Sequence, residues 1–196
     1  LTDGTGGMTL LKTLVAEYLK LAETEIVLDD TLWEANDTPT VEEFENTFAK
    51  VPQSDTTSGF IDKSAVQMSG RLAVNTPCRI VHLKMNTLEL KGVAKKYNTT
   101  VTGYLLMIMF LAGKAATDEL SGDMNIQVPV NMRKFYPSKT VRNFSMYCGI
   151  RIPINKIGDA PSMIDEINEQ LHKKASKEAM NEMLTSTEKM VNMLKY

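Results

Sequence analysis

Two stretches in the second half of the chain carry the period-two pattern of half-buried β-strands. Residues 126–131, "IQVPVN", alternate apolar and polar side chains, and Pro129 restricts this strand to a sheet edge or a strand end. Residues 144–154 are rich in β-branched and aromatic side chains, which favours a second strand. Pro137 and Ser138 predict a turn between them. The pattern therefore predicts two partner strands joined by a polar loop.

Four polar side chains stand where these two strands end and begin. They are Arg133, Arg142, Asn143 and Ser145. Polar groups at the strand ends of α/β proteins often belong to functional sites, because the loops there are exposed while the strands hold them in place. The alternative is a structural role, in which Arg133 makes a surface ion pair and Asn143 caps a turn. Both interpretations stay open on this stretch alone.

Helical periodicity dominates the rest of the chain. Near the start, Leu11, Leu14, Val15 and Tyr18 share one face of an amphipathic helix, which we expect to cover a sheet. A capping box at residues 40–43 predicts a short helix within an otherwise polar connecting region. The pattern also predicts a strand over residues 78–85 and helices over 88–97, over 101–120 and from Pro161 onward. Strands that alternate with helices indicate an α/β fold in which helices cover a mixed sheet.

A glycine-rich stretch, "DGTGG", precedes the first predicted helix. We expect it to form a loop, and a loop of this kind can hold phosphate. The phosphate-binding P-loop needs a lysine and a Ser or Thr after its last glycine, whereas Met8 and Thr9 follow here. The other interpretation is that the glycines let the backbone pass close to another element, while a partner holds Asp3.

Composition and charge exclude several classes of function. The 196 residues carry a net charge of -2, and no run of Lys and Arg with interleaved aromatics predicts nucleic-acid binding. The longest apolar run, "GYLLMIMFLAG", is too short to span a bilayer. Cys78 and Cys148 lie far apart and have no neighbouring Cys or His pair, so no metal site is predicted. We expect a cytoplasmic protein with buried, reduced thiols.

Four segments, in their order along the chain, resemble the CoA-dependent acyltransferase superfamily. They are "DG" followed by glycines and an amphipathic helix, then "VEEFENTFAKV", "LKGVAKKYNTTVTGYLLMIMFLAGKAA" and "VPVNMRKFYPSKTVRNFSMY". That superfamily includes chloramphenicol acetyltransferases, peptide-synthetase condensation domains and alcohol acetyltransferases. The last segment is most similar to the bacterial alcohol acetyltransferase-like branch, through its pattern N-x-R … F-P-S-x-T-x-R-N-F. The resemblance covers nearly the whole chain.

The resemblance implies a fold and a reaction. The fold is a two-layer α/β sandwich with a mixed sheet covered by helices, incomplete here at the N-terminal side. Residues 1–70 would form the tail of a first subdomain and the crossover segment, and residues 71–196 the second subdomain. The reaction would move an acyl group, expected to be acetyl, from a CoA thioester to a small alcohol or amine in a tunnel between the subdomains. Acyl-CoA would be a co-substrate, with no permanently bound cofactor.

The resemblance also implies roles for individual residues. The family signature is His-His-x-x-x-Asp-Gly, and Asp3 and Gly4 match its end. The general base, the second His, would then fall before Leu1, so we expect a second polypeptide or fragment to carry it with the first subdomain. The motif Asp pairs with an Arg of the second subdomain in this family, and Arg133 matches that Arg.

Further residues match less specific positions of the family. Asn143 or Ser145 is the candidate donor to the oxyanion, while Arg142 either faces a CoA phosphate or is an ordinary surface arginine. His82 and His172 have no Ser or Asp at triad-like spacing and are expected to be structural or solvated. Two alternatives remain: a catalytically inactive interaction domain on the same fold, and a condensation domain that takes its acyl group from a carrier protein.

Overall fold

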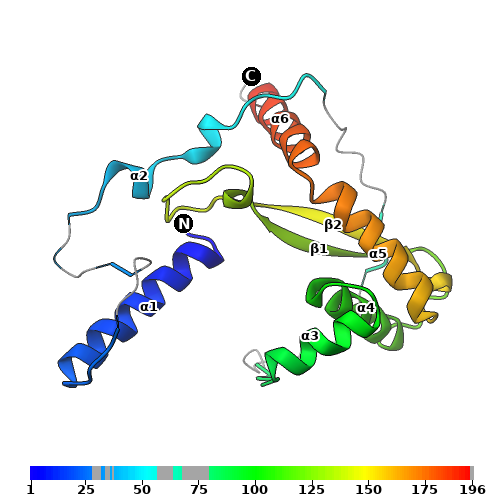
Figure 1. Ribbon diagram of the computed structural model, residues 1–196. Helices are drawn as coiled ribbons and strands as arrows, with labels where there is room; N and C mark the ends of the chain where they lie inside the picture. The colour runs from blue at the N-terminus through cyan, green and yellow to red at the C-terminus, as the bar shows by residue number, and fades with distance from the viewer. Residues whose placement is uncertain (28–31, 34–35, 37, 57–63, 68–79, 195–196) are drawn as a thin grey trace, which may run out of the picture. The chain divides into compact units, whose positions relative to one another are not determined.

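The computed structural model describes residues 1–194 except 28–31, 34–35, 37, 57–63 and 68–79 (Figure 1). The chain forms two compact units. One comprises Leu1–Thr56 with Pro129–Met146, and the other Thr57–Val128 with Tyr147–Tyr196. The predicted boundary at residue 70 lies outside the described residues.

The two predicted partner strands are confirmed. β1 (Asp123–Asn131) and β2 (Ser145–Pro153) pair in a two-stranded antiparallel sheet. Together with six α-helices in the described part of the chain, this sheet confirms the general prediction of a mixed α/β protein.

The register of this hairpin explains why Pro129 is tolerated in β1. Main-chain hydrogen bonds join Met132 to Phe144 at one end and Gly122 to Ile154 at the other. Both bonds connect even-numbered residues, so odd-numbered residues direct their main-chain groups away from the partner strand. Pro129 occupies an odd position, where β2 does not need an N–H group. The same register sends the apolar side chains of both strands to one face.

The described part of the second unit contains four α-helices, each begun by a side-chain cap. They are α3 (Thr87–Lys96), α4 (Val101–Ala115), α5 (Ala160–Lys174) and α6 (Lys177–Met193). The caps Asn86, Thr100, Asp159 and Ser176 accept hydrogen bonds from first-turn N–H groups. α4 ends five residues before the predicted boundary at residue 120.

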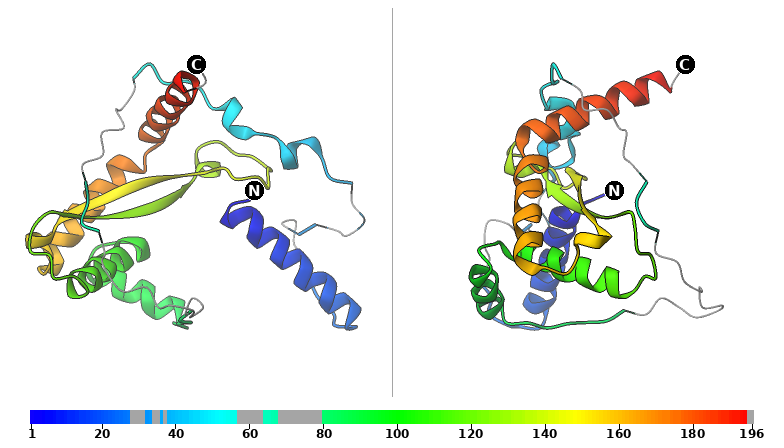
Figure 2. Two further views of the ribbon diagram at one scale, coloured as in Figure 1. Left: turned by 180° about the vertical axis from the view of Figure 1, so that it is seen from behind. Right: turned by 90° about the vertical axis from the view of Figure 1, so that its right-hand side faces the viewer.

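α5 lies along the outer edge of β2 and holds it in place (Figure 2). The Gln170 side chain accepts from the Arg151 N–H at 3.0 Å and donates to the Arg151 carbonyl at 2.7 Å. Lys174 donates to the Gly149 carbonyl at 2.8 Å. These bonds satisfy main-chain groups that would otherwise form an open sheet edge. The apolar faces of α4 and α5 meet here over a core that includes Phe110, Ile150, Ile152, Ile164 and Ile167.

The first unit contains α1 (Gly4–Leu21), α2 (Val41–Phe44) and two short 3₁₀ helices, η1 (Thr47–Lys50) and η2 (Met132–Lys134). The predicted capping box at the start of α2 is confirmed. The predicted glycine-rich loop is wrong, because α1 already begins at Gly4 and includes all three glycines. The Asp3 side chain caps the Gly6 N–H and so starts the helix early.

Two further expectations differ from the structure. The α1 side chains Leu11, Leu14, Val15 and Tyr18 are 48% to 68% exposed, so the predicted packing on a sheet is not found. Periodicity marks a face that can be buried, but it does not supply the surface that buries it. Of the predicted strand 78–85, residues 80–85 form no strand and are exposed, since nothing in the described chain pairs with them; residues 78–79 lie outside the described part.

Candidate functional site

Asp3 and Arg133 form a buried ion pair in the first unit. Arg133 NH1 donates to Asp3 Oδ2 at 2.6 Å, and the two side chains are 11% and 5% exposed respectively. This confirms the pairing that the resemblance implied. The second guanidinium nitrogen does not bind the carboxylate. It donates instead to the carbonyl oxygens of Thr140 at 2.7 Å and Arg142 at 2.9 Å, so Arg133 also organises the loop before β2.

The Asp3 carboxylate caps the start of α1 and also terminates the hydrogen bonding of the β1–β2 hairpin. Its Oδ1 accepts from the Gly6 N–H at 3.0 Å, and its Oδ2 accepts from the Phe144 N–H at 2.8 Å. Phe144 faces Met132 just beyond the last pair of the hairpin, and Met132 N–H donates to the Phe144 carbonyl. Asp3 thus takes the donor that would otherwise continue the β1–β2 ladder. One side chain fixes the start of α1 against the end of the hairpin.

Electrostatics keep Asp3 charged. Burial alone raises the pKa of Asp3, but the hydrogen bond from Arg133, those from the Gly6 and Phe144 N–H groups and the Arg133 charge outweigh it. The pKa of Asp3 therefore lies below its ordinary value of 3.8. An ionised carboxylate with both oxygens engaged is a poor proton acceptor, which suits a positioning role.

Gly6 lets α1 approach the loop before β2. A Cβ atom at Gly6 would overlap the Val141 carbonyl oxygen and Thr2 Oγ1. Thr2 Oγ1 itself donates to that carbonyl at 2.6 Å, and the Asn143 N–H donates to the Leu1 carbonyl at 3.1 Å beside it. Figure 1 shows the N-terminus next to this loop. The interpretation that the glycines permit close backbone approach while Asp3 is held by a partner is confirmed for Gly6, whereas a Cβ atom at Gly4 or Gly7 would meet no atom closer than 3.8 Å.

The connecting region also binds this loop. The Val141 N–H donates to the Glu43 carbonyl at 2.7 Å, and Thr140 Oγ1 donates to the Glu45 carbonyl at 2.8 Å. The Phe48 and Phe144 rings meet edge to face with centroids 4.9 Å apart. Thr140, which is 2% exposed, is a structural residue that the sequence analysis did not select. The threonine of the F-P-S-x-T pattern was the available signal.

Asn143 and Ser145 form a local hydrogen-bonded unit on the exposed side of the hairpin end. The Ser145 hydroxyl donates to Asn143 Oδ1 at 2.8 Å, and the Ser145 N–H approaches the same oxygen at 3.3 Å. A main-chain N–H can only donate, so these contacts fix the orientation of the Asn143 amide. Its Nδ2 group points away from Ser145.

Thr5 and Asn131 belong to the same region, although the sequence analysis selected neither. Asn131 Oδ1 accepts from the Arg133 N–H at 3.1 Å and from Arg133 NH1 at 3.3 Å. Asn131 Nδ2 then donates to Thr5 Oγ1 at 3.2 Å. The Asn-x-Arg spacing within the resemblance was the signal for Asn131, whereas Thr5 carried none beyond its place after the Asp-Gly pair.

The remaining candidates are exposed. Gly4 is the first residue of α1, and Arg142 NH1 donates to the Phe44 carbonyl at 3.3 Å with its side chain otherwise at the surface. His82 and His172 are also exposed, as expected for solvated side chains. Among the described residues, none of these side chains gains a neighbour that would make it a nucleophile or a general base.

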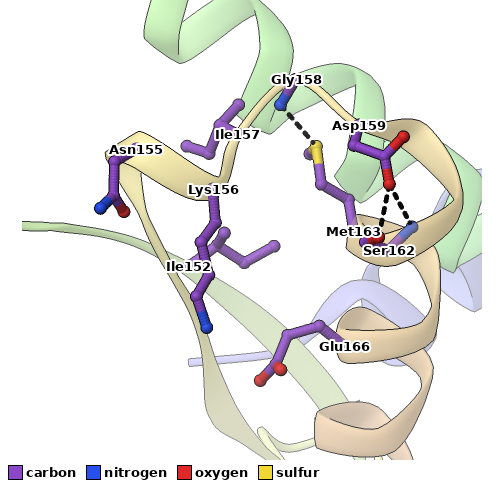
Figure 3. A pocket seen from close by; sticks show the side chains of 9 residues that line it. All are labelled: Ile152, Asn155, Lys156, Ile157, Gly158, Asp159, Ser162, Met163 and Glu166. Carbon is purple, nitrogen blue, oxygen red and sulfur yellow. Dashed lines mark hydrogen bonds between the residues drawn. The ribbon is translucent and has the colours of Figure 1, made fainter.

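The second unit contains a cavity of about 520 Å³ between η3 (Ile154–Lys156) and the start of α5 (Figure 3). Its lining includes the apolar side chains of Ile152, Ile157 and Met163 and the charged side chains of Lys156 and Glu166. The α5 N-terminus beside it is already capped by Asp159. None of the predicted site residues lines this cavity.

Cys148 lies in the core of the second unit. It is a free thiol, 1% exposed. Burial raises the pKa of the Cys148 thiol, and the nearby Lys174 charge offsets this only in part. The expectation of a buried thiol is confirmed for Cys148, while Cys78 lies outside the described residues.

Comparison of the sequence with protein-family models, with curated proteins and with solved structures finds no match. Within the described ranges, no helix combines the length and apolar character needed to cross a membrane. The same residues contain no cluster of His, Cys, Asp and Glu that could hold a metal ion.

Proposed function

We propose that this chain is part of a CoA-dependent acyltransferase that moves an acyl group, expected to be acetyl, from CoA to a small alcohol or amine in the cytoplasm. The observation that carries the proposal is the buried Asp3–Arg133 pair. Nothing local brings these residues together, whereas the resemblance predicts the pair from residue positions alone. In this proposal the complete fold is the two-layer acyltransferase sandwich.

Asp3 acts as a positioning residue in this scheme. Its carboxylate receives donors from three directions, so the backbone on both sides of it has a fixed course. In the motif His-His-x-x-x-Asp-Gly the general base lies a few residues before this Asp, outside the chain described. A fixed helix start at Asp3 and Gly4 would set the direction of the imidazole, and positioning of reacting groups is a large part of catalytic rate enhancement.

The reaction would proceed by direct attack on the thioester. The imidazole takes the proton of the alcohol or amine, a step that contributes about 10² to 10⁴-fold. A bond forms between the acceptor and the carbonyl carbon, and the π electrons move to the carbonyl oxygen. Of the two candidate donors to that oxyanion, Ser145 already donates its hydroxyl proton to Asn143 Oδ1, so Asn143 is the donor in this scheme. One such donor contributes about 3 to 4 kcal/mol. Collapse breaks the C–S bond, and the CoA thiolate receives the proton from the imidazolium.

The exposed face of α1 favours a second candidate, an interaction domain without catalysis. Leu11 and Val15 line a shallow apolar groove of about 400 Å³ together with Met8, Leu19 and Ile26. Apolar surface of this kind marks contact with another polypeptide. The same face would serve the acyltransferase proposal, since the first subdomain must be supplied in addition to these residues.

Release of CoA from acetyl-CoA in the presence of short alcohols or amines tests the proposal. The chain joined to the polypeptide that carries the two histidines should release CoA in an acceptor-dependent way, and substitution of the second histidine by alanine should abolish the release. The chain alone should be inactive. Acceptor-dependent release by the chain alone, lost in His82→Ala or His172→Ala, would show that the base is assigned wrongly. No release from the joined protein would favour the interaction domain.

A further inference from the structure

The hydroxyl proton of Thr5 has no acceptor among the residues that the structure describes. Two donors of Arg133 fix Asn131 Oδ1 as an acceptor, so the group that faces Thr5 must be Asn131 Nδ2, a donor. Thr5 Oγ1 accepts that bond, and its own proton must point elsewhere. Thr5 is exposed, and no described residue accepts this proton.

The Asn143 amide also has hydrogen-bond donors without an acceptor among the described residues. Its Oδ1 receives the hydroxyl and the N–H of Ser145, so its Nδ2 protons point outward. Asn143 is exposed, and its Nδ2 has no acceptor in the described part of the chain. Ser145 donates its only hydroxyl proton to Asn143 Oδ1, so in this arrangement it has no hydroxyl proton left for a ligand.

The two free donors are supported by facing residues of one hairpin. Met132 and Phe144 form a hydrogen-bonded pair, so the preceding pair, Asn131 and Ser145, is the non-hydrogen-bonded kind. Side chains of such a pair leave the same face from Cα atoms about 4.5 Å apart. Asn131 holds Thr5 and Ser145 holds Asn143, so both donors are presented over one end of the sheet.

We propose that Thr5 Oγ and Asn143 Nδ2 together bind the carbonyl oxygen of the acyl thioester and the oxyanion that replaces it. This inference rests on the proposed acyltransferase function and adds Thr5 to its site. Both donors are neutral, and the Arg133 guanidinium is already engaged with Asp3 and with main-chain carbonyls. Neutral donors suit a carbonyl that gains charge only during the reaction, whereas phosphate groups are held mainly by Arg and Lys.

The two donors stabilise the carbonyl oxygen while the thioester carbonyl is converted to a tetrahedral intermediate. As the acceptor oxygen or nitrogen bonds to the thioester carbon, the carbonyl π pair becomes a full charge on oxygen, and the two hydrogen bonds shorten. When the C–S bond breaks, that pair returns to re-form the carbonyl of the product. No proton leaves Thr5 or Asn143 in either direction, so both are required in their neutral forms.

The test uses the chain joined to the histidine-bearing polypeptide, with acetyl-CoA as the probe and kcat and KM measured separately. Thr5→Val and Asn143→Ala should each lower kcat by about 10²-fold with little change in the KM for acetyl-CoA, because the donors act most strongly in the transition state. Thr5→Ser restores the hydroxyl and should recover most of the loss. Thr9→Val is the matched control, since the Thr9 hydroxyl lies one turn along α1 and donates to the Thr5 carbonyl.

Melting temperatures separate catalysis from folding. The inference holds if Thr5→Val loses kcat at an unchanged melting temperature while Thr9→Val keeps it. Unchanged kcat in Thr5→Val, or an equal loss in Thr9→Val, would overturn it and leave the acyltransferase proposal intact. If Thr5→Val fails to fold, Thr5→Ala carries the same comparison. An unsubstituted joined protein that releases no CoA would overturn both proposals.

Discussion

Asp3 and Arg133 stand 130 positions apart in the sequence, and their Oδ2 and NH1 atoms lie 2.6 Å apart in the structure. Around this contact the carboxylate also caps α1 and accepts the last N–H of the hairpin, while the guanidinium holds two carbonyls of the loop. The pair therefore joins three segments, the start of α1, the end of the hairpin and the loop before β2. It is the structural centre of the first unit.

Removing either partner should destabilise the protein strongly. Arg133→Ala leaves a buried carboxylate without its counter-charge, and Asp3→Ala leaves the guanidinium in the same state, at a cost of about 3 to 5 kcal/mol each. The double variant should cost clearly less than the sum, which a double-mutant cycle in urea unfolding measures. Lys20→Ala is the control, because the Lys20–Glu17 pair is more exposed and should contribute at most about 1 kcal/mol. Additive losses at Asp3 and Arg133 would contradict the assignment.

Acidic pH should remove the contribution of the Asp3 carboxylate to the stability of the fold. The pKa of Asp3 is lower in the folded chain than its ordinary value of 3.8, so the unfolded chain binds the proton more readily. The stability that follows is complete above about pH 5 and is lost as the pH falls through the folded pKa. The gap in unfolding free energy between the wild type and Asp3→Asn should be constant from pH 5 to 8, on the order of the ion-pair contribution, and shrink below about pH 4.

The same comparison in the Arg133→Ala background provides the control for this pH dependence. Without the guanidinium, the shrinkage below about pH 4 should be smaller, because the largest lowering influence on the pKa of Asp3 is gone. A gap that widens as the pH falls would mean that burial, which raises the pKa, dominates at Asp3.

Gly6→Ala and Gly7→Ala should have opposite effects, although they are neighbours in one helix. A methyl group at Gly6 would overlap the Val141 carbonyl, and the clash should cost about 1 to 3 kcal/mol or more. At Gly7 the nearest atom is Thr2 Cγ2 at 3.8 Å, so alanine should stabilise α1 by up to about 1 kcal/mol. Thermal or urea unfolding of the two variants measures this. Equal effects would show that α1 does not approach the loop closely.

Local signals in the sequence were sufficient for both strands and for several helix starts. The period-two pattern gave both strands to within a few residues, because a side chain that alternates between core and solvent leaves that period in any sequence. The capping box at residues 40–43 marked the start of α2 for the same kind of local reason, a side chain that satisfies nearby N–H groups. The helix starts predicted at residues 101 and 161 lie within one residue of those of α4 and α5.

Contacts between distant segments were beyond those local signals. The sequence by itself determined the two strands of the β1–β2 hairpin, the starts of α2, α3, α4 and α5 to within one residue and, through a resemblance, the Asp3–Arg133 pair. Only the tertiary structure decided that α1 begins at Gly4, that its apolar face stays exposed, and that residues 80–85 form no strand. It alone showed the free donors of Thr5 and Asn143. The physical reason is that burial, strand pairing and the direction of a hydroxyl proton each depend on a partner far along the chain, which no local pattern encodes.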